Sequence, residues 1–274
     1  MSNDRFKALW EERYGSGVPV PLVTSDPVTE SLMAHRTVRA YLNTPLPEGA
    51  LEAAIAAAQS ASSSSNMQIW SVVAVEDQAR KDRLATLAGN QAHIRQAPLL
   101  LIWLIDFGRL KRIGDAKGKS TENLEYLDTF MVGAVDTGIA AQNAVASFEA
   151  AGLGVVYLGG MRNNSEAVAK ELNLPPLTAV AFGLSVGFPD PTRPAHIKPR
   201  LAPSVVLHRE QYDATGEQES VAHYNDMYAA FQKAEGLPGK RWVDATLPRL
   251  ESPKALHGRE RLRDVLEKQG FGLR

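Results

Sequence analysis

Two continuous apolar runs constrain the fold of this chain most strongly. They are "QIWSVVAVED" (68–77) and "APLLLIWLID" (97–106), and each run of apolar residues stops at an acidic residue. A continuous apolar run of this length, bounded by polar residues, is typical of a strand inside the core. The sequence therefore predicts a buried sheet that contains these two segments.

Further strands and helices follow from hydrophobic period and end signals. "LGVVYLGG" and "TAVAFGLSVGFP" predict two more strands. A short amphipathic helix is predicted from about Phe6 to Tyr14, and a second begins after Asp26 as N-cap with Pro27 at its first position. Pro47 opens a third helix, which we expect to end in the serine run that follows.

A long helix is predicted within residues 122–152, and Gly152 stops it. Its small residues indicate close approach to a neighbour, at the centre of the fold or in a subunit interface; they are Gly133, Gly138, Ala141 and Ala144. Asn163, with Glu166 three residues later, predicts a capping box at the start of another helix. From about Glu210 onward the chain is polar and helical with no evident core face, so we expect an arm that wraps a partner.

Composition excludes several classes of function. The 30 Lys and Arg residues nearly balance the 31 Asp and Glu residues, so no overall basic field attracts nucleic acid or anionic lipid. The chain has no cysteine, which excludes disulfides, thiolate metal ligands, iron–sulfur clusters and cysteine nucleophiles. Any redox chemistry must therefore come from a cofactor. The N-terminal residues lack a secretory signal pattern, and the longest apolar run is shorter than the ~20 residues that span a bilayer, so we expect a cytoplasmic protein.

Familiar nucleotide and metal motifs do not occur. No GxGxxG lies between a predicted strand and helix, and no GxxxxGK[ST] is present, which disfavours a Rossmann domain and a P-loop. The six histidines show no HExxH spacing. We therefore predict no metal.

Cationic residues are crowded in "MAHRTVRAYL", which contains His35, Arg36 and Arg39. Guanidinium groups suit phosphate and carbonyl oxygens in fixed directions, although cations also suit a helix C-terminus. The two glycines of "YLGG" can mark a strand end, or a place where a flat ring lies against bare backbone. The sequence leaves both alternatives open for each segment.

Two further segments carry side chains that suit a phosphate or a polyol. In "HIKPRLAP", Pro199 favours an extended chain with Lys198 and Arg200 on one face, where the alternative is a solvated charge pair. The serine run in "ASSSSNMQIW" can be a flexible loop, but its hydroxyls, with Asn66 and Gln68, also suit a polyol chain or phosphate. A serine nucleophile is disfavoured, because no GxSxG is present. Together the segments predict one cofactor that carries a phosphate and a ring.

These segments resemble motifs of the FMN-dependent nitroreductases, and within them the oxygen-insensitive NADPH nitroreductase and flavin reductase P subgroup. "HRTVRAY" is similar to the family's "HRS-R-F", and "SSSSNMQIW" to its "PSS-N-Q-W" loop with Ser62 in place of proline. "GNQAH", "GLGVVYLGGMRNN" and "IKPRL" resemble three further motifs in the same order. The resemblance covers about Ser31 to Gln211 and resumes loosely near the C-terminus.

The resemblance implies an α+β nitroreductase-like fold, with a mostly antiparallel central sheet flanked by helices. It also implies a homodimer with FMN sites at the interface and a C-terminal arm wrapping the partner subunit. We expect a single domain over 1–274, with an N-terminal extension (1–25), an FMN-binding core (26–209) and a C-terminal helical arm (210–274).

Residue roles are carried over position by position. Arg36, Lys198 and Arg200 would hold the FMN phosphate with help from His35, and Ser63 with its neighbours would meet the tail. Arg39 and Gln91 would contact the pyrimidine edge, where a cation stabilises negative charge on the ring. The full set of expected FMN contacts is His35, Arg36, Thr37, Arg39, Ser62, Ser63, Ser64, Asn66, Gln91, Tyr157, Leu158, Gly159, Gly160, Lys198 and Arg200.

The implied activity is that of an NAD(P)H-dependent FMN oxidoreductase. NADPH or NADH would donate a hydride and leave, and a nitroaromatic, quinone or flavin would then accept two electrons at the same site in a ping-pong cycle. The flavin carries the chemistry, so no catalytic side chain is expected. The alternative is a non-catalytic FMN sensor or carrier on the same scaffold, because a fold does not fix a function.

Two positions depart from the subgroup. Asn66 stands where the subgroup tends to have an aromatic residue beside the acceptor site. Glu235 falls in a stretch that is basic in the subgroup, before Lys240 and Arg241, which we expect at the NADPH 2′-phosphate. We therefore expect NADPH to be preferred over NADH, but less strongly than a fully basic arm would allow.

Overall fold

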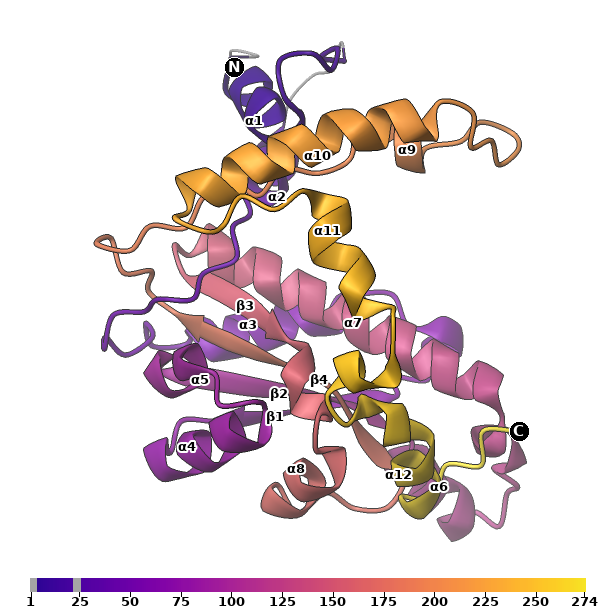
Figure 1. Ribbon diagram of the computed structural model, residues 1–274. Coiled ribbons are helices and arrows are strands. Elements are labelled where there is room, and N and C mark those ends of the chain that lie inside the picture. The colour runs from indigo at the N-terminus through magenta and orange to yellow at the C-terminus, as the bar shows by residue number, and fades with distance from the viewer. Residues whose placement is uncertain (1–3, 22–25) are drawn as a thin grey trace. The chain divides into compact units, whose positions relative to one another are not determined.

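The structure is a computed structural model that describes residues 4–21 and 26–274 (Figure 1). The chain forms two compact units, each made of segments that are distant in sequence. The first unit contains the described residues up to Arg36 together with His196–Ala255. The second contains Thr37–Ala195 and Leu256–Arg274.

An antiparallel sheet is the centre of the second unit. Within the described residues its four strands run in the order β1-β2-β4-β3, and all three neighbouring pairs are antiparallel. The strands are β1 (Trp70–Val75), β2 (Leu99–Asp106), β3 (Gly154–Leu158) and β4 (Thr178–Gly187). Every residue of β2 is buried, as its continuous apolar run predicts. The four predicted strands and the predicted α+β class are thus confirmed. The expected burial is wrong for β1, because it lies at the edge of the sheet, where only Val75 is buried and Ala74 is exposed.

Helices cover both faces of this sheet. Leu99, Leu101 and Trp103 of β2 pack with α3 (Ala50–Gln59) and α7 (Leu127–Ala150). The alternate residues, Leu100, Ile102 and Leu104, face the opposite layer, because successive side chains of a strand point to opposite sides. That layer consists of α4 (Gln78–Leu87), α5 (Ala92–Gln96) and α8 (Ser165–Glu171).

Short elements complete the second unit, and Figure 1 labels the longer ones. They are η1 (Ser64–Asn66), α6 (Gly108–Ala116), η2 (Glu122–Glu125), η3 (Gly159–Arg162), η6 (Arg259–Arg261) and α12 (Leu262–Lys268). The end of the chain differs from the expectation of a polar arm without a core face, because Leu266 and Phe271 are buried beside Ile105 and Phe107. The described parts contain no helix long and apolar enough to cross a membrane.

The first unit is built from helices packed through aromatic and amide side chains. Tyr224 of α10 (Glu217–Ala234) is buried, and its ring meets that of Trp242 edge-on with 5.5 Å between the ring centroids. The amide oxygen of the buried Asn225 accepts from the Val243 N–H at 3.1 Å. The elements are α1 (Asp4–Tyr14), α2 (Pro27–Met33), α9 (Pro203–Val206), α10 (Glu217–Ala234), α11 (Trp242–Thr246) and η4 (Leu247–Arg249), with η5 (Pro253–Leu256) at the unit boundary. The proposed division of the chain into extension, core and arm stays a prediction.

Helix ends match the sequence signals at some positions and not at others. Asp26 caps α2 as predicted, accepting from the N–H groups of Val28 and Thr29 at 2.9 and 3.0 Å. The predicted capping box at Asn163 is wrong, because the neighbouring Asn164 accepts from the Ala167 N–H.

Two other helices begin later than predicted. The third helix starts at Ala50, not Pro47, because Gly49 has a left-handed φ of 75° that cannot continue a helix. The long helix starts at Leu127, because Tyr126 is extended and separates it from the 3-10 turn of η2.

Candidate functional site

Two of the predicted cationic segments lie side by side in the first unit, joined by the buried side chain of Arg13. One terminal nitrogen of its guanidinium donates to the carbonyl oxygens of Met33 and His35 at 2.6 and 3.2 Å. The other donates to the carbonyl oxygen of Lys198 at 3.0 Å, across 185 positions of sequence. The main chain of Arg13 adds a fourth link, because its carbonyl accepts from the Arg200 N–H at 2.9 Å. The sequence analysis did not single out Arg13.

Burial alternates along the Lys198–Arg200 segment, a pattern consistent with the extended chain that Pro199 predicts. Pro199 is buried, whereas Lys198 is half-buried and Arg200 is exposed, so the two cations alternate with an inward-facing proline. The hydroxyl of Tyr224 donates to the Pro199 carbonyl at 3.1 Å. Burial of Tyr224 raises the pKa of its hydroxyl. The segment is thus fixed through its main chain by two buried side chains, Arg13 and Tyr224.

Residues expected at the NADPH 2′-phosphate also belong to the first unit. The exposed guanidinium of Arg241 pairs with Asp226 of α10 at 3.2 Å. The main-chain N–H of Lys240 donates to the buried amide of Gln232 at 2.9 Å, which holds the loop after α10. The carboxylate of Glu235, the acidic departure in this stretch, is in hydrogen-bond contact with Nδ1 of His196. Its carboxylate therefore has a partner within its own unit.

In the second unit, Arg39 is directed outward by an extended segment that runs beside β3. Thr37 bridges Val155 in parallel register, and the Val38 N–H donates to the Val155 carbonyl at 2.9 Å. Val38 and Ala40 are buried, so the intervening Arg39 faces solvent. This approach depends on Gly154, where a Cβ would lie 2.5 Å from a Val38 methyl carbon.

The serine loop is held by a buried carboxylate that the sequence analysis missed. The Ser63 hydroxyl donates to Asp136 of α7 at 2.7 Å, and the Ser64 N–H lies 3.2 Å from the same oxygen. Ser63 also accepts from the Gln68 N–H at 2.8 Å. Ser63 therefore fixes the loop, and its hydroxyl proton is already donated within the protein.

The rest of this loop presents polar groups to solvent. Ser62, Ser64 and Asn66 are exposed, and the Asn66 amide accepts from the Gln68 side chain at 3.2 Å. Three residues adopt the left-handed region of φ, which is uncommon for residues other than glycine; they are Ser65, Asn66 and Gln68. Main-chain and side-chain hydrogen bonds thus hold this loop.

Gln91 and Gly160 come together in the second unit. A Cβ on Gly160 would lie 2.6 Å from both the Ala88 carbonyl oxygen and the Gln91 side-chain nitrogen, which are themselves bonded at 2.8 Å. Gly160 is thus required by protein packing. A Cβ on Gly159 would meet only arginine side chains at 3.7 Å or more, so Gly159 is the position that leaves bare backbone.

Of the two residues before these glycines, Leu158 has a buried side chain and Tyr157 has an exposed one. Leu158 is 1% exposed and belongs to the core, so only its main chain is open to a ligand. Tyr157 is 38% exposed, and its hydroxyl donates to Gln142 at 3.2 Å. Of the two side chains, Tyr157 is therefore the one that can contact a bound molecule.

His93, in the "GNQAH" segment, carries a buried ring nitrogen. Its Nε2 makes no hydrogen bond with any described residue. Burial lowers the pKa of His93, and the nearby Arg39 guanidinium lowers it further. His93 is therefore neutral at pH 7, and Arg39 is the charged member of this pair.

Each unit, taken by itself, offers groups of the kind that suit part of an FMN molecule. The first unit supplies the cations Arg36 and Arg200, both exposed, and the second supplies the outward Arg39, the ordered serine loop and the open main chain at Gly159. A phosphate needs cations and N–H donors, a polyol needs hydroxyl and amide partners, and a flat ring needs uncovered backbone. Each of these groups is present.

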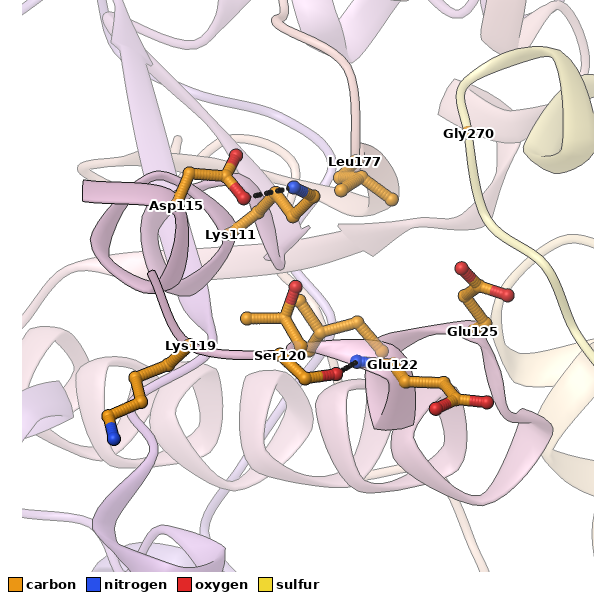
Figure 2. Close-up of a pocket in the computed structure, with 10 residues that line it drawn as sticks. Lys111, Asp115, Lys119, Ser120, Glu122, Glu125, Leu177 and Gly270 are labelled. Atoms are coloured by element: carbon orange, nitrogen blue, oxygen red, sulfur yellow. Dashed lines mark hydrogen bonds and ion pairs between the residues drawn. The ribbon is translucent and has the colours of Figure 1, made fainter. Parts of the chain in front are cut away.

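A separate pocket of about 340 Å³ lies in the second unit and involves none of the predicted site residues (Figure 2). Lys111 and Asp115 of α6 pair with each other at its edge, and Ser120 accepts from the Glu122 N–H at 3.3 Å. Its lining mixes both signs of charge and contains no aromatic ring. It therefore does not suit a flat anionic cofactor.

Comparison with known proteins identifies the family. The sequence profile of the nitroreductase family matches residues 32–188, and that of the nitroreductase family C-terminal domain matches residues 198–274. The chain belongs to the nitroreductase family. A relative from Salmonella typhimurium, an oxygen-insensitive NADPH nitroreductase, is 35% identical over 90% of this chain and 99% of its own length.

Solved structures agree with the fold of this nitroreductase. The hypothetical oxidoreductase YcnD from Bacillus subtilis has a TM-score of 0.85 and 33% identity, covering 91% of this chain and 99% of that one. The NADPH:FMN oxidoreductase from Vibrio harveyi, complexed with NAD+, has a TM-score of 0.79 and 31% identity, covering 91% of this chain and all of that one. The predicted family, fold class and class of enzyme, an FMN-dependent NAD(P)H oxidoreductase, are confirmed. The residue-level contacts to FMN and NADPH stay predictions.

Proposed function

We propose that this nitroreductase uses FMN to pass two electrons from NADPH or NADH to nitroaromatic, quinone or flavin acceptors in a ping-pong cycle. The observation that carries the proposal is the pairing of the His35–Arg36 and Lys198–Arg200 segments through Arg13. Two segments about 160 residues apart in sequence are thus linked to one side chain, which supports the proposal that both supply cations to one phosphate. Similar proteins include an oxygen-insensitive NADPH nitroreductase and an NADPH:FMN oxidoreductase, which supports the proposal.

The residues that would hold FMN divide by the part of the cofactor they suit. Arg36, Lys198 and Arg200, with His35, suit the phosphate, and the serine loop from Ser62 to Asn66 suits the polyol tail. Arg39 and Gln91 suit the pyrimidine edge, and the main chain at Leu158–Gly160 suits the ring. When bound, FMN supplies the chemistry of hydride acceptance and two-electron donation. The protein groups position the cofactor, and Arg39 supplies positive charge to the ring edge.

The NADPH preference is assigned to Lys240 and Arg241. A 2′-phosphate carries close to two negative charges, so it gains from nearby cations that NADH does not use. Arg241 is paired with the exposed Asp226, which weakens its field. We therefore expect NADPH to be preferred only moderately.

A homodimer is part of the proposal, and α7 provides the surface that favours it. Leu127, Met131, Val135 and Ile139 recur every four residues, so they form one stripe on the helix. Their exposed fractions are 45, 59, 56 and 41%, respectively. A contiguous exposed apolar stripe of this kind marks an interaction surface. Gly138 lies beside the stripe, three residues after Val135, and no atom lies within 4 Å of the position of a Cβ there. This leaves room for close approach by the partner subunit.

Anaerobic addition of NADPH to the purified FMN-loaded protein tests the function. Rapid loss of the oxidised flavin absorbance, recovered on adding a nitroaromatic or a quinone, is the expected result. A protein that binds FMN without being reduced by NADPH or NADH would be a sensor or carrier.

Steady-state kinetics should give parallel double-reciprocal lines, because donor and acceptor use one site in turn. Intersecting lines with both substrates bound together would exclude the shared site.

A further inference from the structure

The N-terminal helix α1 lies outside the part of the chain that matches the nitroreductase family, which begins at residue 32. One of its side chains nevertheless reaches both segments that are assigned to the FMN phosphate. Arg13 is 6% exposed and sits in the last turn of α1. Its guanidinium bonds to three carbonyl oxygens, on Met33, His35 and Lys198.

The carbonyl groups that Arg13 binds need such a donor for a structural reason. Met33 is the last residue of α2, and the final carbonyls of a helix have no partner within the helix. A cationic donor at this end also interacts favourably with the helix dipole. Arg13 therefore ends α2 at Met33 and fixes the chain as it leaves toward His35 and Arg36.

The same side chain fixes the second segment. The Lys198 carbonyl accepts from Arg13, and the Arg200 N–H donates to the Arg13 carbonyl, so both sides of Pro199 are tied to α1. The N–H groups of a planar guanidinium point in fixed directions, so one arginine can bind several acceptors at once. The ammonium of a lysine has three rotatable donors and fixes its acceptors less strictly. The spacing between the two segments is thus set by one arginine.

We propose that Arg13 is a positioning residue for the FMN phosphate: it holds the two cationic segments at the spacing at which their side chains grip one phosphate. The inference rests on the proposed function, which assigns those segments to the phosphate. It makes α1 part of the cofactor site, although Arg13 reaches that site only through the main chains of its neighbours.

Binding of FMN is compared with binding of riboflavin, which has the same ring and tail but no phosphate. Dissociation constants are measured by fluorescence titration of the full chain after removal of flavin. For Arg13→Ala we expect the FMN constant to rise about tenfold or more, the loss of roughly one charge-assisted bond. The riboflavin constant should change less than about twofold, because the ring and tail contacts stay in place.

Two further variants make the comparison specific. Arg5→Ala is the matched control, because Arg5 lies on the same helix but is exposed and pairs with Glu30 at 3.5 Å. It should leave both constants unchanged. Arg13→Lys keeps the charge but loses the guanidinium fork. It should therefore weaken FMN binding more than riboflavin binding, and by less than the alanine variant does. If Arg13→Ala does not fold, the ratio of the two constants in Arg13→Lys decides the question.

The outcomes separate the two proposals. A wild-type protein that binds riboflavin as tightly as FMN would overturn the phosphate site itself. A wild-type preference for FMN that is unchanged in both Arg13 variants would overturn the positioning role alone. A parallel rise of the FMN and riboflavin constants would show that Arg13 supports the fold in general, which also contradicts the inference.

Discussion

Asp136 and Ser63 are joined by a hydrogen bond of 2.7 Å between a carboxylate in the long helix α7 and the hydroxyl of the serine loop. Asp136 is only 4% exposed, and the Ser64 N–H also lies within bonding distance of it. Helix α7 therefore performs two tasks, since the same helix orders a predicted FMN loop and carries the exposed apolar stripe.

Replacing Asp136 tests this link. Asp136→Ala should lower the free energy of unfolding by about 1.5–3 kcal/mol, the range for a hydrogen bond to a charged group. Urea unfolding of the full chain measures this change. Asp128→Asn, an exposed acid on the same helix, is the control and should have a much smaller effect. An unchanged urea midpoint for Asp136→Ala would mean that the loop is held by its other contacts.

The apolar stripe on α7 predicts how the dimer can be broken. Val135→Glu places a carboxylate at the centre of the stripe, and a two-fold interface would bury it twice. Uncompensated buried charge costs about 3–5 kcal/mol, so the dimer dissociation constant should rise at least about a hundredfold. Light scattering after size-exclusion chromatography measures the mass. Ile113→Glu, at an exposed apolar residue of α6, should leave the mass unchanged; if both variants stay dimeric, another surface forms the interface.

Acid should destabilise the protein through His93. Burial and Arg39 hold the pKa of His93 below its ordinary value, so the unfolded chain binds the proton more tightly than the folded chain. The free energy of unfolding then rises with pH between that lowered pKa and about 6.5. Above about pH 6.5 the contribution of His93 no longer changes with pH. One proton limits the slope to at most about 1.4 kcal/mol per pH unit.

Unfolding measured from pH 5 to pH 8 checks the sign. His93→Gln should reduce the loss of stability below about pH 6.5, whereas His223→Gln, at an exposed histidine, should not. Identical pH profiles for the wild type and His93→Gln would show that His93 does not titrate differently in the folded state.

Local signals in the sequence were enough to predict the main elements. Both apolar runs became strands, because apolar side chains gain by leaving water. Only β2 is fully buried, since β1 lies at the edge of the sheet and only Val75 of it is buried. Asp26 caps a helix because its carboxylate bonds to N–H groups two and three residues away. Pro199 restricts its own backbone, so the alternation of Lys198 and Arg200 also follows from local geometry.

The residues that were missed act over long distances in sequence. Arg13 bonds to a carbonyl 185 positions away, and Ser63 bonds to a carboxylate 73 positions away. An arginine in an amphipathic helix, or an aspartate in a long helix, gives no local sign that it will be buried. The packing that requires Gly160 could not be predicted for the same reason, since the atoms that crowd it belong to Ala88 and Gln91.

We expect the cofactor preference to depend on the pair formed by Arg241 and Asp226. Both side chains are exposed, so their attraction is weak, and exposed pairs contribute about 0.2–1 kcal/mol. Removing the carboxylate with Asp226→Asn should free Arg241 for the 2′-phosphate and lower the KM for NADPH by about 1.5- to 5-fold. The KM for NADH should not change, because NADH lacks that phosphate.

Arg241→Ala should have the opposite effect, raising the KM for NADPH and leaving NADH unaffected. Both changes should shrink as salt is raised from low ionic strength, because exposed charges are screened. Glu235 is bound to His196, so Glu235→Gln should alter the KM for NADPH less than Asp226→Asn does. Equal changes with NADPH and NADH in the Arg241 and Asp226 variants would place this pair outside the 2′-phosphate site. A larger effect at Glu235 would instead mean that its carboxylate, despite its histidine partner, opposes the phosphate directly.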